Sequence, residues 1–379
     1  MAEEHMTDEQ LNQNQDAQSR VVKDQQQESS EDHEHDDDIV VGLDGSRESF
    51  AALRWSLAEA SASGQNVNAV FGWTPSWNAG SEPKTDEEWD KLRQTLITTL
   101  NDWVDDAIPD FDMDPERLTL TSVQASGPAA LLEIGTHAQQ IVVGKRNIGP
   151  LTRWFLGSTS APLIEDAKVP VTLVHIPPED SVSVSASIAA ALTVAGTMSG
   201  SMSPATNGTP GQPRDSADNA SNQSENSENQ STRDEAKLQN RSPLVVGVDG
   251  SDISLKALQF AVHEADVHGS DLHVLLCWQM KDLGTIPGYE NAVAPIHVGQ
   301  LQAEEKLRDI VAKVHVPNSV TIHLHAFHTT AVKGIMDASK YAGWIIVGSR
   351  GLTGMNARLL GSVSRQLLNL AECTVTIVH

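Results

Sequence analysis

Hydrophobic and polar residues follow the same order in two stretches of the chain, residues 39–176 and 244–379. Each stretch alternates short β-branched apolar runs with longer segments whose apolar residues recur every three or four positions. The short runs predict buried strands, and the periodic segments predict amphipathic helices. Strands that alternate with helices favour a parallel sheet covered on both faces. We therefore expect an α/β protein made of two repeated domains.

The repeat is visible residue by residue. Residues 39–73 align without a gap to residues 244–278, and the identical pairs include Gly42/Gly247, Asp44/Asp249, Gly45/Gly250, Ser46/Ser251, Glu59/Glu264 and Trp73/Trp278. The ends also match, VTLVH at 171–175 against VTIVH at 375–379. We therefore divide the chain into an acidic tail (1–37), a first domain (38–178), a linker (179–242) and a second domain (243–379).

The two segments outside the domains are polar. Residues 1–37 are rich in Gln, Glu, Asp and His, which predicts disorder, and they lack the pattern of a signal peptide. The sequence HEHDDD at 33–38 offers metal ligands, but a solvated acidic tail is the favoured interpretation. The Ser-, Asn-, Gln- and Pro-rich composition of the later part of the linker predicts a flexible segment. The less polar part of the linker, 181–202, contains only short apolar runs, whereas a transmembrane helix needs about 20 apolar residues. This part either packs locally or binds a partner.

Charge and cysteine content exclude several classes of function. The net charge is −25 and no basic stripe is present, so we expect neither nucleic-acid binding nor binding to anionic membranes. Cys277 and Cys373 have no CxxC or zinc spacing and suit buried thiols in a reducing cytoplasm. His323 and His325 alternate on a predicted strand, where surface histidines are favoured over a metal pair. We predict no metal site.

A glycine pattern follows one strand in each domain. In IIVGSRGLTGMNARLLGSVS (345–364), Gly348 ends an apolar run, Gly351 follows, and Gly361 and Ser362 open a helix. Glycine tolerates positive φ and lets backbone N–H groups approach an anion, and a helix N-terminus favours phosphate. The alternative is a turn before an ordinary helix. Residues 141–160 repeat the arrangement, with Asn147 in place of the second glycine. Because the whole arrangement occurs twice, we favour a phosphate-binding loop.

Asp44 and Asp249 each follow the first strand of a domain. In an open parallel sheet they lie at the carboxyl edge, where the glycine loops also leave the sheet. If strands one and four are neighbours, this edge is a topological switch point, where ligands bind. The alternative for each aspartate is a helix N-cap.

These motifs resemble the universal stress protein family, in particular its ATP-binding branch with the pattern Gly-x-x-Gly-x9-Gly-Ser/Thr. The resemblance covers both domains and implies a tandem member. It implies that each domain is an open, twisted, five-stranded parallel sheet with helices on both faces, Rossmann-like and of the adenine nucleotide alpha hydrolase type. The implied ligand is ATP, accompanied by Mg²⁺. The second domain fits the pattern in full, whereas the first departs from it at Asn147.

The resemblance also implies the residues of the site, with adenine held by backbone groups at residues 72–73 and 277–278. The implied nucleotide-binding residues of the second domain are Gly247, Val248, Asp249, Cys277, Val347, Gly348, Arg350, Gly351, Gly361, Ser362, Val363 and Ser364. Those of the first domain are Gly42, Leu43, Asp44, Gly72, Val143, Gly144, Arg146, Asn147, Gly157, Ser158, Thr159 and Ser160.

Catalytic motifs are missing from the sequence: it contains no GxxxxGK[ST], GxSxG or HExxH. We therefore predict no catalytic residues and a cytoplasmic stress-response regulator that binds ATP mainly in its second domain. One alternative is a slow ATPase, or an enzyme that phosphorylates itself at Ser362 or Ser158; another is an interaction scaffold that binds no nucleotide. The expected partners are an adenine nucleotide, the other domain of the same chain through the matched end strands, and a second chain in a homodimer.

Overall fold

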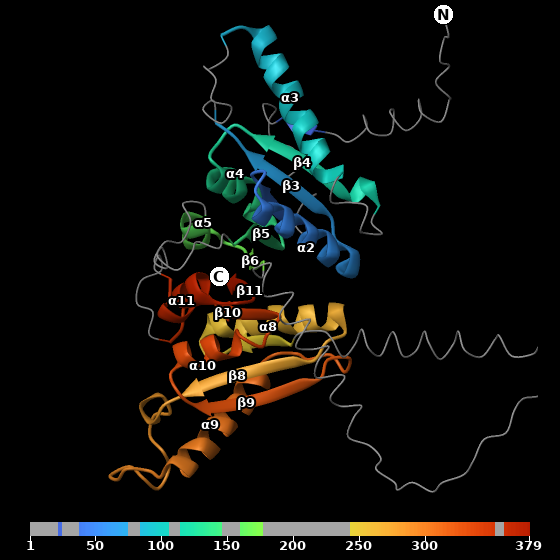
Figure 1. Ribbon diagram of the computed structural model, residues 1–379. Helices are drawn as coiled ribbons and strands as arrows, with labels where there is room; N and C mark the ends of the chain where they lie inside the picture. The colour runs from blue at the N-terminus through green and yellow to red at the C-terminus, as the bar shows by residue number, and fades with distance from the viewer. Residues whose placement is uncertain are drawn as a thin grey trace, which may run out of the picture. The chain divides into compact units, whose positions relative to one another are not determined.

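The computed structural model describes residues 22–24, 38–74, 84–105, 114–145, 160–176, 243–352 and 360–379. The strands of these residues form one sheet in the order β1-β4-β3-β2-β5-β6-β11-β10-β7-β8-β9 (Figure 1). Within it, β4-β3-β2-β5-β6 and β9-β8-β7-β10-β11 are two copies of one parallel arrangement, with the third, second, first, fourth and fifth strand of a domain in that order. The prediction of a repeated α/β fold is confirmed.

The first domain follows the predicted alternation of strands and helices. Its elements are β2 (Ile39–Leu43), α2 (Arg47–Ser63), β3 (Val67–Gly72), α3 (Asp86–Asp105), the 3₁₀ turn η2 (Pro115–Arg117), β4 (Leu118–Val123), α4 (Gly127–Ile134), η3 (Gly135–His137), β5 (Gln140–Gly144), α5 (Ser160–Asp166) and β6 (Val171–Val174).

The second domain repeats this plan. Its elements are β7 (Leu244–Gly247), α8 (Asp252–His268), β8 (Leu272–Trp278), η4 (Met280–Asp282), α9 (Ile296–Val311), β9 (Ile322–His328), α10 (Ala331–Ala338), β10 (Trp344–Gly348), α11 (Ser362–Leu370) and β11 (Thr374–Val378).

Serine and glycine set the ends of the first helix in each domain. The side chains of Ser46 and Ser251 accept hydrogen bonds from the third residue that follows and cap α2 and α8. Gly64 and Gly269 end the same helices in the left-handed conformation that glycine tolerates. The apolar periodicity predicts a helix from Phe50, but α2 begins at Arg47, because the serine cap rather than the first buried residue fixes its start.

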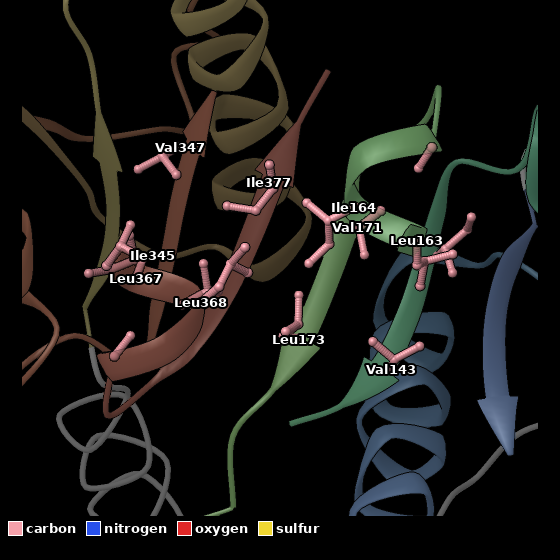
Figure 2. Packing of buried hydrophobic residues seen from close by; sticks show 14 of the residues in the cluster. Val143, Leu163, Ile164, Val171, Leu173, Ile345, Val347, Leu367, Leu368 and Ile377 are labelled. Carbon is pink, nitrogen blue, oxygen red and sulfur yellow. The ribbon is translucent and has the colours of Figure 1, made fainter. Parts of the chain in front are cut away.

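The helices cover both faces of the sheet. Buried residues of α2 and α3 pack on one face of the first domain, and those of α8 and α9 form the equivalent cluster in the second. On the opposite face, α4, α5, α10 and α11 share a single cluster that includes residues of both domains (Figure 2). Leu163 and Ile164 of α5, and Leu367 and Leu368 of α11, are at most 3% exposed there. These strands therefore lie between two apolar layers, as their continuous apolar sequences predict.

Strands β6 and β11 join the two copies. They run antiparallel, with Thr376 opposite Thr172 and Ile377 opposite Val171. Figure 2 shows the side chains of Val171 and Ile377 on the adjoining strands. The two threonine hydroxyls lie 2.8 Å apart, and Lys145 Nζ donates to the carbonyl of Ala371 at 2.6 Å. Polar and apolar contacts thus both cross this boundary.

A short strand lies inside the predicted acidic tail. β1 (Val22–Asp24) pairs in parallel with β4, so the expectation of a tail without structure is wrong for these three residues. Valine favours strands, and the edge of β4 offers backbone groups to pair with. The rest of residues 1–37 lies outside the described residues.

Candidate functional site

The carboxyl edge of the sheet brings the first and fourth strands of each domain together. β7 pairs with β10, with Gly247 opposite Val347, and β2 pairs with β5 in the same way. The prediction that strands one and four are neighbours is confirmed. The chain continues from β7 through α8 to β8 on one side of this pair, and from β10 to β11 on the other side, so a topological switch point lies between β7 and β10.

The turn after the first strand is the same in both domains. Gly45 and Gly250 have φ values of 77° and 91°, in the left-handed region that favours glycine. Asp249 Oδ1 accepts from the backbone N of Ser251 at 2.9 Å and from its hydroxyl at 2.6 Å. Asp44 Oδ1 accepts from Ser46 in the same way, at 3.0 and 2.5 Å. The serines therefore cap the helices, and the aspartates orient the serines, so the N-cap alternative for Asp44 and Asp249 is wrong.

Asp249 also contacts the loop that follows β10. Its Oδ2 accepts a hydrogen bond from the backbone N of Leu352 at 2.8 Å. A Cβ at Gly351 would overlap the same carboxylate oxygen, so only glycine lets the loop approach Asp249 this closely. The aspartate and the second glycine of the motif, which lie about a hundred positions apart in the sequence, are thus in direct contact.

The start of α11 is attached to the end of β10. The backbone N of Gly361 donates to the carbonyl of Ser349 at 2.8 Å, and the buried hydroxyl of Ser364 donates to the carbonyl of Gly348 at 2.8 Å. Ser362 is exposed, and Gly361 is the N-cap. The first turn of a helix has N–H groups without intrahelical partners, so α11 directs such groups toward the switch point.

The prediction of positive φ at the glycines of the motif is wrong. Gly348, Gly351 and Gly361 do not have positive φ. A Cβ at Gly348 would lie 2.8 Å from the side chain of Ile253, and one at Gly144 would overlap the backbone of Glu48. Close packing of the first helix on the fourth strand therefore requires glycine at these two positions. Part of the glycine spacing thus belongs to the fold itself.

Basic side chains lie beside the loop of the second domain. Burial and the charges of Arg350 and Lys256 lower the pKa of His379 to about 4, and Lys256 Nζ donates to the carbonyl of His379 at 3.1 Å. His379 follows Val378, which lies opposite Gly348. Sequence patterns did not single out Lys256. Helical spacing from Asp249 gives no signal either, because Asp249 precedes the N-cap Ser251 and lies outside α8.

The second strand brings position 277 close to the same edge. Cys277 lies in β8, where a Cβ on Gly334 of α10 would overlap its sulfur. Burial raises the pKa of the Cys277 thiol to about 11, so the thiol is protonated and unreactive. Gly72 occupies the equivalent position, where a Cβ would lie 2.8 Å from Gly127 Cα. Both cysteines are free.

The remaining predicted residues fall into two groups. Those of the second domain lie at the ends of β7 and β10 or at the start of α11: Gly247, Val248, Val347 and Val363. In the first domain Gly42, Leu43, Val143, Gly144 and Ser160 lie on the equivalent elements. Arg146, Asn147, Gly157, Ser158 and Thr159 lie outside the described residues, as do 33–37 of the acidic HEHDDD segment.

His323 and His325 do not form a pair with each other. His323 Nε2 lies 2.9 Å from Asp271, and His325 Nε2 lies 3.0 Å from Nδ1 of His273 on the neighbouring strand. Each histidine is thus engaged across the strands, on a strand whose Leu324 and Phe327 are also exposed.

The strand order, the aspartate turn and the loop before α11 define a doubly wound α/β protein with a topological switch point between its first and fourth strands, present twice in one chain. The universal stress protein family model matches residues 37–175 and 240–379, so the chain belongs to this family. Among the residues that the structure describes, no helix is both long and apolar enough to cross a membrane.

Similar proteins have the same tandem length. A universal stress protein of Mycolicibacterium smegmatis is 27% identical over 352 residues, covering 90% of this chain and 96% of the relative. One from Mycobacterium tuberculosis is 24% identical with the same coverage. The crystal structure of a universal stress protein from Archaeoglobus fulgidus superposes with a TM-score of 0.51 at 14% identity, over 91% of this chain and 96% of that chain, which shows the shared fold.

Proposed function

We propose that the chain is a regulatory protein of the stress response that binds ATP, mainly in its second domain. The observation that carries the proposal is the contact between Asp249 and the loop after β10. It places a carboxylate suited to ribose hydroxyls beside a glycine loop and the start of a helix. A ribose partner next to a phosphate-binding helix N-terminus is the arrangement by which α/β proteins hold nucleotides.

The charges around the loop support the same ligand. Lys256 and Arg350 supply two positive charges beside His379, next to the strand that leads into the loop, and a triphosphate needs such neutralisation. The hydroxyl of Ser349 in this loop is buried and has no hydrogen-bond partner among the described residues. A phosphate oxygen would supply the acceptor that the Ser349 hydroxyl lacks. Mg²⁺ would accompany the nucleotide through its phosphates and water rather than through a protein cage.

The first domain is the weaker candidate. Ala51 occupies the position of Lys256, and Lys145 occupies the position of Ser349. The amino group of Lys145 is engaged with Ala371 and so points to the domain boundary rather than to a ligand. Asn147 replaces Gly351, whose lack of a Cβ admits Asp249 in the second domain. Three differences at the same edge thus favour the second domain.

The test is ATP binding by calorimetry on the whole chain and on Gly361→Asp, with Gly157→Asp as the matched control in the first domain. The added carboxylate repels phosphate at the start of α11. We expect the second-domain variant to lose the tight site while circular dichroism shows an unchanged fold. Unchanged ATP binding by Gly361→Asp would refute the assignment, and an absence of binding to the folded wild type would favour the scaffold.

A binding role also predicts that ATP stays intact. Phosphoryl transfer needs a positioned base or nucleophile and charge stabilisation, and no side chain has been assigned such a role. We expect the bound nucleotide to be recovered as ATP after hours of incubation. Release of ADP, or phosphate retained on Ser362, would instead support the enzyme.

We propose that the two domains pair within one chain through β6 and β11. The antiparallel pairing and the shared apolar cluster support this. Light scattering on the intact chain tests it together with the expected homodimer. We also propose a cytoplasmic location, because two free thiols suit a reducing compartment.

A further inference from the structure

Three titratable side chains meet where α2 and α8 lie side by side. Glu59 comes from the first domain, whereas Glu264 and His268 are one turn apart on α8. The side chains of Glu59 and Glu264 are 4% and 1% exposed, and that of His268 is 26% exposed. Two buried carboxyl groups therefore share one location with a histidine that reaches solvent.

The distances between these groups are short. His268 Nε2 lies 2.9 Å and 3.0 Å from the two carboxylate oxygens of Glu59, and 4.0 Å from Oε2 of Glu264. One nitrogen of His268 and one carboxylate oxygen of each glutamate all lie within 4.8 Å of one another. Ligands around a tetrahedral Zn²⁺ are about 3.3 Å apart, given bonds of about 2.0 Å. Small rotations of these side chains are enough to reach that geometry.

A second observation shows that the cluster is incomplete. Oε1 of Glu264 is buried and has no hydrogen-bond partner among the described residues. An unpaired carboxylate oxygen in such a place is costly, and the two adjacent carboxyl groups repel each other when both are ionised. A cation between them removes both penalties. Without a cation, the hydrogen bond between the side chains of Glu264 and Glu59 requires a proton on one of the two carboxyl groups.

We propose that Glu59, Glu264 and His268 form a binding site for a divalent transition-metal ion, with Zn²⁺ as the best match. Imidazole and carboxylate groups both ligate zinc, and three protein ligands leave a fourth position for water. The imidazole ligand disfavours Mg²⁺ and Ca²⁺, which prefer oxygen. Zn²⁺ enters beside the exposed part of His268 and takes the lone pair of Nε2 in the neutral tautomer that carries its hydrogen on Nδ1. It displaces the proton of Glu264, which is released to solvent.

The site is single although the chain is a repeat. Glu59 and Glu264 are equivalent positions, but Ser63 occupies the position of His268 in the first domain. The cation would therefore bind once per chain. Its ligands would come from both domains, so that binding strengthens their association.

The experiment is calorimetric titration of the full, chelator-treated chain with ZnCl₂ in two buffers that differ in ionisation enthalpy. We expect one tight site per chain and release of about one proton per ion. Glu264→Gln and His268→Ser should each weaken binding by about 100-fold or more. Two matched controls, His323→Ser and the combined His33→Ser/His35→Ser, should leave this site unchanged.

Tryptophan fluorescence supplies an independent readout. The ring of Trp344 lies 6.2 Å from that of His268, and Trp55 lies 5.1 Å from Trp344. Co²⁺ bound at the cluster should quench this emission in the wild type and not in Glu264→Gln. Glutamine keeps the size of a protonated glutamate, so this variant should fold. No tight binding to the wild type, or equal binding and quenching in Glu264→Gln, would overturn the proposal.

Discussion

The backbone N–H of Leu352 donates to Oδ2 of Asp249 at 2.8 Å, and this bond joins the first turn of the second domain to its glycine loop. Oδ1 of the same carboxylate holds Ser251, the N-cap of α8. One side chain therefore holds both the turn before α8 and the loop after β10, which border the candidate nucleotide site. Its loss should affect the site more than the stability of the sheet, because these bonds lie at the edge of the fold.

We expect Asp249→Ala to weaken ATP binding by about tenfold to a hundredfold, since hydrogen bonds to a charged group contribute about 1.5–3 kcal/mol. Asp44→Ala is the matched control in the first domain and should change the tight site little. Calorimetry measures both, with circular dichroism as the check of folding. An equal loss in the two variants would contradict the assignment of the main site to the second domain.

Gly351→Ala should displace the loop, because the new Cβ would overlap Oδ2 of Asp249. We expect weaker ATP binding, by about tenfold or more, with a small change in unfolding free energy. The clash disappears when Asp249 is also shortened. In the double variant Asp249→Ala/Gly351→Ala, the glycine substitution should therefore weaken ATP binding much less than it does alone. Fully additive losses of ATP affinity would show that the two residues do not interact.

The sequence alone supports most of the fold. Apolar runs such as 345–347 and the two Asp-Gly-Ser turns predict the strands and the start of the first helices, because strand burial and helix capping depend on local residues. The gapless repeat then fixes two copies. The edge pairing of Val22–Asp24 with β4 depends on a distant strand, so the local polar composition did not predict it.

The site could be predicted less completely. Glycine spacing located the loop but not the packing at Gly348, where Ile253 approaches from a helix about a hundred residues earlier. Lys256 and the Glu59–His268 contact depend on which helix faces lie together. Such faces are fixed by tertiary packing, and a single sequence contains no direct signal for them.

Thr376 lies at the centre of a hydrogen-bond chain that crosses the domain boundary. Trp344 Nε1 donates to Thr376 Oγ1 at 2.8 Å, and Thr172 Oγ1 donates to Gln140 at 2.7 Å. Because each hydroxyl has one proton, Thr376 must donate to Thr172. Thr376→Val should cost about 1–3 kcal/mol in urea unfolding, since it leaves buried groups unpaired. A cost no larger than that of Thr119→Val on β4 would contradict this role.

Two histidines at equivalent strand ends should make stability depend on pH. Burial, with the charge of Lys145, lowers the pKa of His175 to about 4, and burial with Arg350 and Lys256 does the same for His379. Between about pH 6.5 and 4 the unfolded chain binds these protons and the folded chain does not. Stability should therefore fall as the pH decreases through this window. Urea midpoints at several pH values should show a shallower slope for His379→Asn, and the exposed His297→Asn should leave the slope unchanged.

Glu264 should produce the opposite pH dependence in the metal-free chain. Burial first, and then the neighbouring Glu59, raises the pKa of Glu264 well above its ordinary value. Above that ordinary value the unfolded chain releases the proton and the folded chain retains it, so the contribution of this group to stability falls as the pH rises. His268 is the basic group facing the pair. Glu264→Gln carries no titrating proton and should therefore be more stable than the wild type at neutral pH.

Urea unfolding in the presence of a chelator, at pH values from 4 to 8, measures this difference between the wild type and Glu264→Gln. We expect the two stability curves to converge near pH 4 and to separate as the pH rises, because the carboxyl group is protonated in both states only at the acidic end. Glu305→Gln on the exposed side of α9 is the matched control and should follow the wild type. Adding Zn²⁺ should stabilise the wild type and not Glu264→Gln, since only the wild type has both carboxylates to bind the cation in the folded state. A glutamine variant that is less stable than the wild type throughout this range in chelator would show that the carboxyl group makes a stabilising contact, and that the buried pair carries no stored repulsion for a cation to relieve.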